Sequence, residues 1–294
     1  MGRNRKSILY PVILFLISVT ITGIISVLSG SGTKETIEQY MVKNEASLSA
    51  SEDSESYYRT EKTDLEIIFR GSVIRIDSGE TREGRAFEVY IDGEFSKEFS
   101  DNKPNNNKVS IEYSRTYGEM NIIISDDTYL GSITVNAPAA DIYINGIDSD
   151  SIRAESNAGC ISCYDLFCSD IKATSQSGHI YIEDCESVVT AVDTETGNIT
   201  VHGHSREFYI TSENGSIEFV PDKIDLRADI TTENGDIKTV LKENEEIVLN
   251  IESSCGDINM PESFIYNDNG YVRENDSPVF NIKTTDGCIT IEVI

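Results

Sequence analysis

The residues best suited to chemistry in this chain of 294 residues are six cysteines, three histidines and 51 aspartates and glutamates. Cys160 and Cys163 have the Cys-x-x-Cys spacing of redox pairs and zinc ligands. On a β-strand these two side chains would point to opposite faces, which separates the thiols. His179 follows Cys160 by 19 residues and could share a site with it, but a structural zinc ion needs four ligands. We therefore expect no redox dithiol, no metal site and no cofactor.

Two other cysteine pairs hold related places in the chain. Cys168 and Cys185 lie nine and seven residues past successive glycines, and Cys255 and Cys288 stand beside glycines of two equivalent turns. Either pair could reach the separation of about 4.4–6.8 Å between Cα atoms that a disulfide requires. Buried cysteine is equally useful as a small apolar filler. The sequence leaves both pairings open.

No other motif predicts catalysis. His202-Gly203-His204 follows an expected strand, lacks the helical spacing of zinc proteases, and is interpreted as a turn. The chain has no Gly-x-Ser-x-Gly elbow, phosphate-binding loop or dinucleotide fingerprint. Among 51 acidic residues some carboxylates approach one another by chance, and a glycosidase also needs a substrate cleft. We expect a protein that is not an enzyme, with a solenoid enzyme acting on cell-wall or extracellular glycans as the alternative.

A repeat of about 19 residues arranges these side chains. Eight glycines mark it, each with isoleucine two positions later and serine or threonine three positions earlier; they are Gly131, Gly159, Gly178, Gly197, Gly215, Gly235, Gly256 and Gly287. Apolar residues alternate after each glycine, which indicates a strand. The glycine is expected to supply a positive φ at a turn, and the hydroxyl to bond inside that turn.

A copy of this length holds two short strands and no helix, and only stacked copies could bury the isoleucine column. The sequence therefore predicts an all-β fold, a β-solenoid of about 19-residue repeats. Acidic turn residues recur, but the Gly-Gly-x-Gly-x-Asp pattern of calcium-binding rolls is absent. A calcium ladder is therefore not expected.

The N-terminal segment predicts a membrane anchor. Residues 8–28 carry no charge and would span about 31 Å as a helix. Arg3, Arg5 and Lys6 precede them, which places the N-terminus in the cytoplasm. We expect a cytoplasmic segment at 1–7, a transmembrane signal anchor at 8–29, a flexible Ser/Glu-rich linker at 30–60 and an extracellular β-solenoid domain at 61–294. A cleaved signal peptide remains the alternative.

The repeat resembles a known family. Units such as 212–217 (Ser-Glu-Asn-Gly-Ser-Ile) and 232–237 (Thr-Glu-Asn-Gly-Asp-Ile) are similar to those of the bacterial β-strand-repeat family DUF4097, whose members are named as candidate adhesins. The resemblance covers about residues 64–294. It implies a β-solenoid on the bacterial envelope, without a settled activity, and some relatives are linked to envelope stress. The expected function is a non-catalytic, membrane-anchored surface module, adhesin-like or an envelope scaffold.

The last repeat interval is 31 residues and contains an insertion at 261–278. Its aromatic residues Phe264, Tyr266 and Tyr271 predict a loop that contacts a partner, either an envelope protein or a glycan. The alternative is a hairpin that covers the edge strands at the end of the stack.

Charge restricts the partners. The chain has a net charge of -27, and removing the three basic residues before residue 31 leaves -30 for the remainder. Such a field repels phosphate backbones and anionic lipids, so nucleic acid is not an expected partner.

The same charge predicts a salt dependence. Turn acids that recur in successive repeats should repel one another along the stack. Moderate salt or millimolar calcium should therefore raise the melting temperature of the folded part by screening, without a stoichiometric site. Calorimetry decides this, because a saturable calcium isotherm at micromolar concentration would contradict it.

Overall fold

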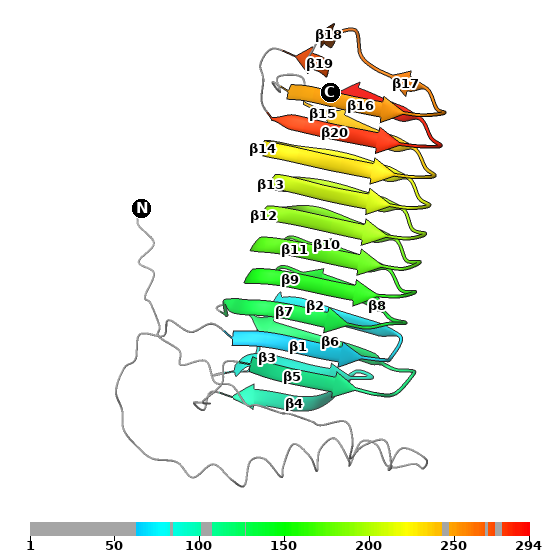
Figure 1. Cartoon of the computed structure of the whole chain (residues 1–294). Coiled ribbons are helices and arrows are strands. Elements are labelled where there is room, and N and C mark those ends of the chain that lie inside the picture. The colour runs from blue at the N-terminus through cyan, green and yellow to red at the C-terminus, as the bar shows by residue number, and fades with distance from the viewer. Residues whose placement is uncertain are drawn as a thin grey trace, which may run out of the picture.

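The computed structural model describes residues 63–294, apart from 83–84, 101–107, 127, 243–246, 268–269 and 274–277. The expected anchor at 8–29 and linker at 30–60 lie outside the described residues. Among the residues that are described, no helix is long and apolar enough to cross a membrane. The described part is all-β and forms one 21-stranded sheet, coiled into a solenoid-like stack (Figure 1).

The strands are β1 (Thr63–Phe69), β2 (Val73–Gly79), β3 (Arg85–Ile91), β4 (Glu94–Ser100), β5 (Lys108–Tyr113), β6 (Glu119–Ser125), β7 (Leu130–Asn136), β8 (Asp141–Asn145), β9 (Asp148–Ser156), β10 (Ile161–Tyr164), β11 (Phe167–Ser175), β12 (Ile180–Thr194), β13 (Ile199–Ser212), β14 (Ile217–Thr232), β15 (Ile237–Leu241), β16 (Ile247–Ser253), β17 (Ile258–Asn259), β18 (Ile265–Asn267), β19 (Gly270–Arg273), β20 (Val279–Thr284) and β21 (Ile289–Val293).

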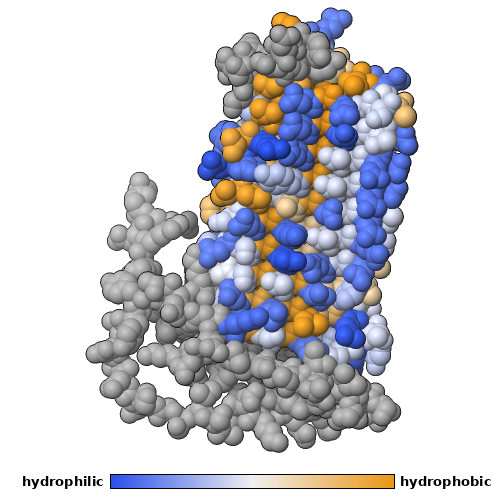
Figure 2. Space-filling view, viewed as in Figure 1, coloured by the Kyte–Doolittle hydropathy of each residue, from blue (hydrophilic) through white to orange (hydrophobic). Residues whose placement is uncertain are grey.

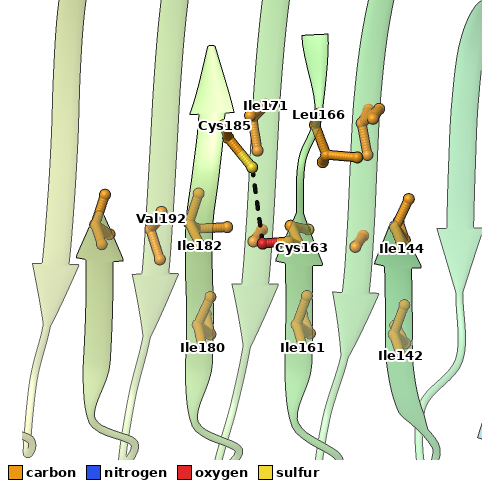
Figure 3. Packing of buried hydrophobic residues seen from close by; sticks show 14 of the residues in the cluster. Ile142, Ile144, Ile161, Cys163, Leu166, Ile171, Ile180, Ile182, Cys185 and Val192 are labelled. Carbon is orange, nitrogen blue, oxygen red and sulfur yellow. Dashed lines mark hydrogen bonds between the residues drawn. The ribbon is translucent and has the colours of Figure 1, made fainter. Parts of the chain in front are cut away.

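Each coil covers two faces, either with two strands or, in β12, β13 and β14, with one long strand that continues from one face to the other. Neighbouring coils pair in parallel. Ile142, Ile161, Ile180 and Ile199 stand opposite one another in successive coils, and all are buried. Figure 3 shows part of this column in the core. The expected isoleucine ladder is thus confirmed for these coils, because in-register pairing places equivalent residues about 4.8 Å apart. Ile258 in β17 departs from it, since 37% of this residue is exposed near the end of the stack.

The hydroxyl column bonds within its own turn and also to the next coil. Ser175 Oγ accepts a hydrogen bond from the Gly178 amide at 2.8 Å and donates to the Gly159 carbonyl at 3.4 Å. Bonds from the hydroxyl to the turn carbonyl of a neighbouring coil recur at Ser156, Thr194, Ser212, Thr232, Ser253 and Thr284. The column therefore connects successive coils as well as closing each turn.

Glycine is required at the turn for a different reason than expected. Positive φ is found at Gly93, Gly118, Gly146 and Gly203 but at none of the described repeat glycines. A Cβ atom on Gly178 would instead lie 1.9 Å from the carbonyl oxygen of Gly159. Close backbone stacking, and not a left-handed turn, thus excludes any side chain here.

The first repeat was placed on the wrong face. Ile133 pairs with Ile152, before the turn, whereas Ile142 pairs with Ile161 after it. Ala140 takes the glycine position of this coil, since its carbonyl oxygen would lie 1.8 Å from a Cβ on Gly159. The error has a physical cause, because strands on both faces show the same alternation of buried and outward residues.

The order of coils in space differs from their order in the chain. The last coil, β20–β21, lies between β14–β15 and β16–β17. The first, β1–β2, similarly lies between β5–β6 and β7–β8. Antiparallel strands close both ends, with β3 on β6 and β19 on β16. The insertion at 261–278 therefore contains a hairpin, β18–β19, at the end of the stack (Figure 1).

Replacing Ser175 tests the turn. Ser175→Ala leaves the buried Gly178 amide and Gly159 carbonyl without this partner, which should cost about 1–3 kcal/mol of unfolding free energy. Ser175→Thr keeps the hydroxyl, as threonine does in other coils, and should cost much less. Denaturant unfolding of both variants measures the difference, and equal stabilities would contradict the role assigned to the hydroxyl.

Removing residues 279–294 tests the coil order. Phe280, Ile282, Ile289 and Ile291 are buried, and their loss removes burial that contributes about 6–12 kcal/mol. β16–β17 would also lose the coil on which they stack. We expect a chain ending at Pro278 to have a much lower melting temperature than the full chain. Amide hydrogen exchange should also become faster in residues 247–273. Unchanged protection in 247–273 would show that those strands do not depend on the last coil.

Candidate functional site

The three aromatic residues singled out in the insertion lie at the end of the stack. Phe264 is 9% exposed and belongs to the hydrophobic core cluster. Tyr266 and Tyr271 stand opposite each other across the β18–β19 hairpin. Phe264 thus packs the end of the stack, while the backbone of the two tyrosines forms the strands that cover it. The contact of this loop with a partner stays a prediction.

Three cysteines share the core of neighbouring coils. Cys163, Cys168 and Cys185 are buried, and the Cys185 thiol donates to the Cys163 carbonyl at 3.7 Å (Figure 3). Burial raises the pKa of Cys168 and of Cys185 to about 12 and that of Cys163 well above its usual value. The Glu186 amide bonds to the Leu166 carbonyl, so Cys185 lies beside Leu166. All three thiols are free and fill the core.

The remaining cysteines lie at the glycine turns, also as free thiols. Cys255 is exposed, and a hydrogen bond with Asp286 of the next coil raises its pKa. The Cys288 amide donates to the Asp236 carboxylate at 2.8 Å. The Cys255 side chain therefore contacts Asp286, whereas Cys288 contacts Asp236 through its backbone amide.

The proposed neighbour of Cys160 has another partner. His179 Nδ1 accepts a hydrogen bond from the Asn198 amide at 3.0 Å, and the Cys160 amide donates to Asp141 at 2.8 Å. At this place in the turn, the side chain thus accepts a hydrogen bond from a backbone amide of the neighbouring coil. Within the part of the chain that the structure describes, no group of three or more His, Cys, Asp or Glu residues could hold a metal ion.

The two remaining histidines lie on a strand, not in the expected turn. His202 and His204 belong to β13, whose register shifts at Gly203. His204 lies between carboxylates of the flanking coils, with Nδ1 3.8 Å from Glu186 Oε1 and Nε2 3.4 Å from Asp225 Oδ2. A bulge accounts for the difference, because it lets the strand bend without ending. The histidine thus pairs with acids of its own stack.

The acids at the glycine turns stand in a row. Glu195, Glu213 and Glu233 are exposed at matching places of successive coils, as backbone bonds such as Asn214 to Glu195 show. Hydrophilic residues line this side of the stack in Figure 2. Their mutual repulsion is the physical basis of the expected salt dependence.

Sequence reasoning missed a group of tyrosines on the face formed by β2, β8, β10 and β12. Tyr143 and Tyr181 are the register partners of Ser162 on either side, and Tyr164 lies two residues beyond Ser162 on β10. We call Tyr143, Tyr164 and Tyr181 the tyrosine cluster. Tyrosine at outward positions after the turns was visible in the sequence, but only the register brings the three together.

Comparison with known proteins identifies the family. Residues 62–292 match the family described as Toastrack DUF4097, so the chain belongs to that family. No curated protein matches the chain.

Two solved structures are similar. A candidate adhesin from Bacteroides fragilis has 15% identity and a TM-score of 0.44, covering 81% of this chain and 94% of its own. A candidate cell adhesion protein from Clostridium sporogenes has 14% identity and a TM-score of 0.29, covering 80% and 93%.

The cysteine environments predict a labelling pattern. Cys168 and Cys185 have a pKa of about 12 in place of 9. The fraction of each that is ionised at pH 8 should therefore be about a thousandfold lower than for an unperturbed thiol. Alkylation of the native chain, followed by mass spectrometry, should label exposed Cys255 and leave these two unmodified. Labelling of all six in denaturant is the control, and equally fast native labelling would contradict the buried placement.

The same shift gives a pH dependence. Unfolded thiols ionise from about pH 8.5, whereas Cys168 and Cys185 stay protonated in the folded chain up to about pH 12. Stability should therefore fall as pH rises between these values. Replacing both cysteines with serine should make the free energy of unfolding depend less on pH in this range, as measured by denaturant unfolding at a series of alkaline pH values. An unchanged dependence would assign it to other groups.

Proposed function

We propose that this member of the Toastrack DUF4097 family is a non-catalytic surface module anchored in the cell membrane. Residues 8–29 cross the membrane with the N-terminus in the cytoplasm, and residues 61–294 lie outside the cell. The module acts as an adhesin-like binder or as a scaffold associated with the envelope. Its partner is an envelope protein or a glycan.

The main support is the distribution of polar groups on the stack. Charged side chains pair with close neighbours, as in Lys108–Glu66 at 2.8 Å and Lys283–Glu252 at 3.0 Å. Such exposed pairs are common on a solvated face. Catalysis instead needs an acid, a base and binding groups that converge on one substrate. Two long outward faces built on regular strands suit binding.

The pairing of β1 also suits an anchored module. β1 begins at Thr63, immediately after the proposed anchor and linker, and pairs in parallel with both β5 and β7. A pull on the anchor would load two ladders together along the strand direction. An edge strand could be peeled away one hydrogen bond at a time. Tension on an N-terminal anchor would thus be shared by two ladders, which supports the proposal of an anchored module.

Localisation and attachment can be tested with the full-length chain in intact cells. Protease added outside should remove residues beyond the linker and spare a tag placed before residue 8. Cells that make the chain should retain isolated envelope fragments better than cells that make residues 1–60 alone. Protection of the β-domain from outside protease, or equal retention by both strains, would contradict the proposal.

The enzyme alternative predicts a different result. Incubating the full-length chain with cell-wall glycans should release no soluble product above a heat-denatured control. Product release that scales with protein concentration would replace the binding function with a glycan-acting enzyme.

A further inference from the structure

The two edges of the stack carry different side chains. One edge holds the glycine turns, and at the other edge the chain returns from one face to the opposite face. We call this second edge the corner edge, and it consists of residues 146–150, 165–169, 184–188, 203–206 and 221–226. It lies at the left of the stack in Figure 2, where apolar residues reach the surface among polar ones.

Three exposed apolar side chains gather on the corner edge. Phe167, Val188 and Leu226 are 54%, 43% and 46% exposed. Away from the C-terminal end of the stack, they are the only large apolar side chains other than tyrosine that are exposed in the described part of the chain. Isolated exposed apolar residues are common on proteins, but their concentration on one edge is typical of a contact surface.

The backbone fixes these three positions. Phe167 begins β11, which pairs in parallel with a strand on either side. The buried Ser205 hydroxyl donates a hydrogen bond to the Val188 carbonyl at 3.1 Å. Beside Arg206, β14 contains one extra residue, and Leu226 lies in this irregular part of the strand. Because such a bulge changes the direction of a side chain, the exposure of Leu226 is a property of the fold.

The spacing of the three side chains suits a helix laid along the stack. Val188 lies one coil beyond Phe167, and Leu226 lies two coils beyond Val188, so the row is about 14 Å long. An α-helix presents one side of itself every 5.4 Å, and over three coils this repeat differs from the coil repeat by only about 1.8 Å. Phe167 is displaced sideways by about 7 Å, which is within the width of an apolar helix stripe.

Charge indicates which kind of helix would bind. The corner edge contains seven acidic residues and two basic ones, a net charge of -5; the acidic residues are Asp148, Asp150, Asp165, Asp184, Glu186, Asp222 and Asp225, and the basic ones are Arg206 and Lys223. Lys223 already pairs with Asp225 at 2.5 Å, whereas Asp148 and Glu186 are exposed beside Phe167 in register. This charge attracts cationic partners and repels anionic lipid and nucleic acid.

We propose that the corner edge binds a basic amphipathic helix of a protein partner. The helix lies along the stack with its apolar side on Phe167, Val188 and Leu226, and its basic residues pair with Asp148 and Glu186. Helices with an apolar stripe flanked by Lys and Arg combine both features in one element. This assignment rests on the proposed binding function and names the class of partner.

Fluorescence anisotropy of a labelled Leu/Lys peptide of about 18 residues tests the corner edge. Its leucines form one side of a helix and its lysines the other. The full-length chain in a neutral detergent should bind this peptide saturably at about 0.15 M salt, above the signal of empty micelles. The triple variant Phe167→Ser, Val188→Ser, Leu226→Ser should bind it at least about tenfold more weakly.

The glycine-turn edge supplies the matched control. Glu195, Glu213 and Glu233 have no exposed large apolar residue within two positions in the chain. Replacing all three with glutamine should change the affinity by less than about twofold, since charges act over only about 8 Å at this salt. A scrambled peptide of equal composition should bind more weakly to the wild-type chain. Melting curves check the fold, and Phe167→Ser alone should weaken binding about threefold if the triple variant is unstable.

The outcomes separate this assignment from the proposed function. Absence of saturable peptide binding, or equal binding by the triple variant, overturns the helix site. Self-association of the wild-type chain that the triple variant abolishes, measured by sedimentation, would assign the corner edge to a second copy instead. Attachment to envelope fragments without peptide binding overturns the site while the surface function stands. Peptide binding by a chain that does not attach to the envelope supports the site and counts against the proposed function.

Discussion

Backbone contact between successive turns is the constraint on which the rest of this structure depends. A Cβ atom at Gly159, Gly178, Gly197 or Gly215 would lie 1.8–2.1 Å from a carbonyl oxygen of the coil beside it, well inside any allowed contact. At these four positions the turns can therefore approach only as bare backbone. That approach brings the hydroxyl column within reach of the next coil and holds the isoleucines in register. Packing and charge repulsion both follow from this spacing.

The same contact explains how the ends of the chain are secured. Because the glycine turns from Gly159 to Gly287 are nearly alike, the last coil can be placed between two others without a new kind of interface. Both the first and the last coil of the chain take such interior positions. Antiparallel strands then cover the outer coils, which limits edge-to-edge association. The stack thus resists unravelling from its termini.

Regular packing inside leaves the outward positions free to vary. Most inward residues are apolar or bond to turns, but an outward residue meets mainly its register partners and solvent. Acidic residues therefore lie along the edge formed by the glycine turns, and aromatic residues from three coils lie on the face that carries the tyrosine cluster. The buried cysteines belong to the inward set, and their raised pKa values are a result of packing.

The sequence alone determined the repeat length, the inward isoleucines and the inward hydroxyls, because each depends on local alternation and turn chemistry. It misplaced Gly131 and Ile133, since both faces of the stack alternate in the same way. The order of the coils was decided only in three dimensions, because equivalent apolar columns allow several stacking orders. The grouping of Tyr143, Tyr164 and Tyr181 was likewise fixed by register, since their separation along the chain carries no sign of contact. Local chemistry thus specified each coil, and coil-to-coil pairing specified the site.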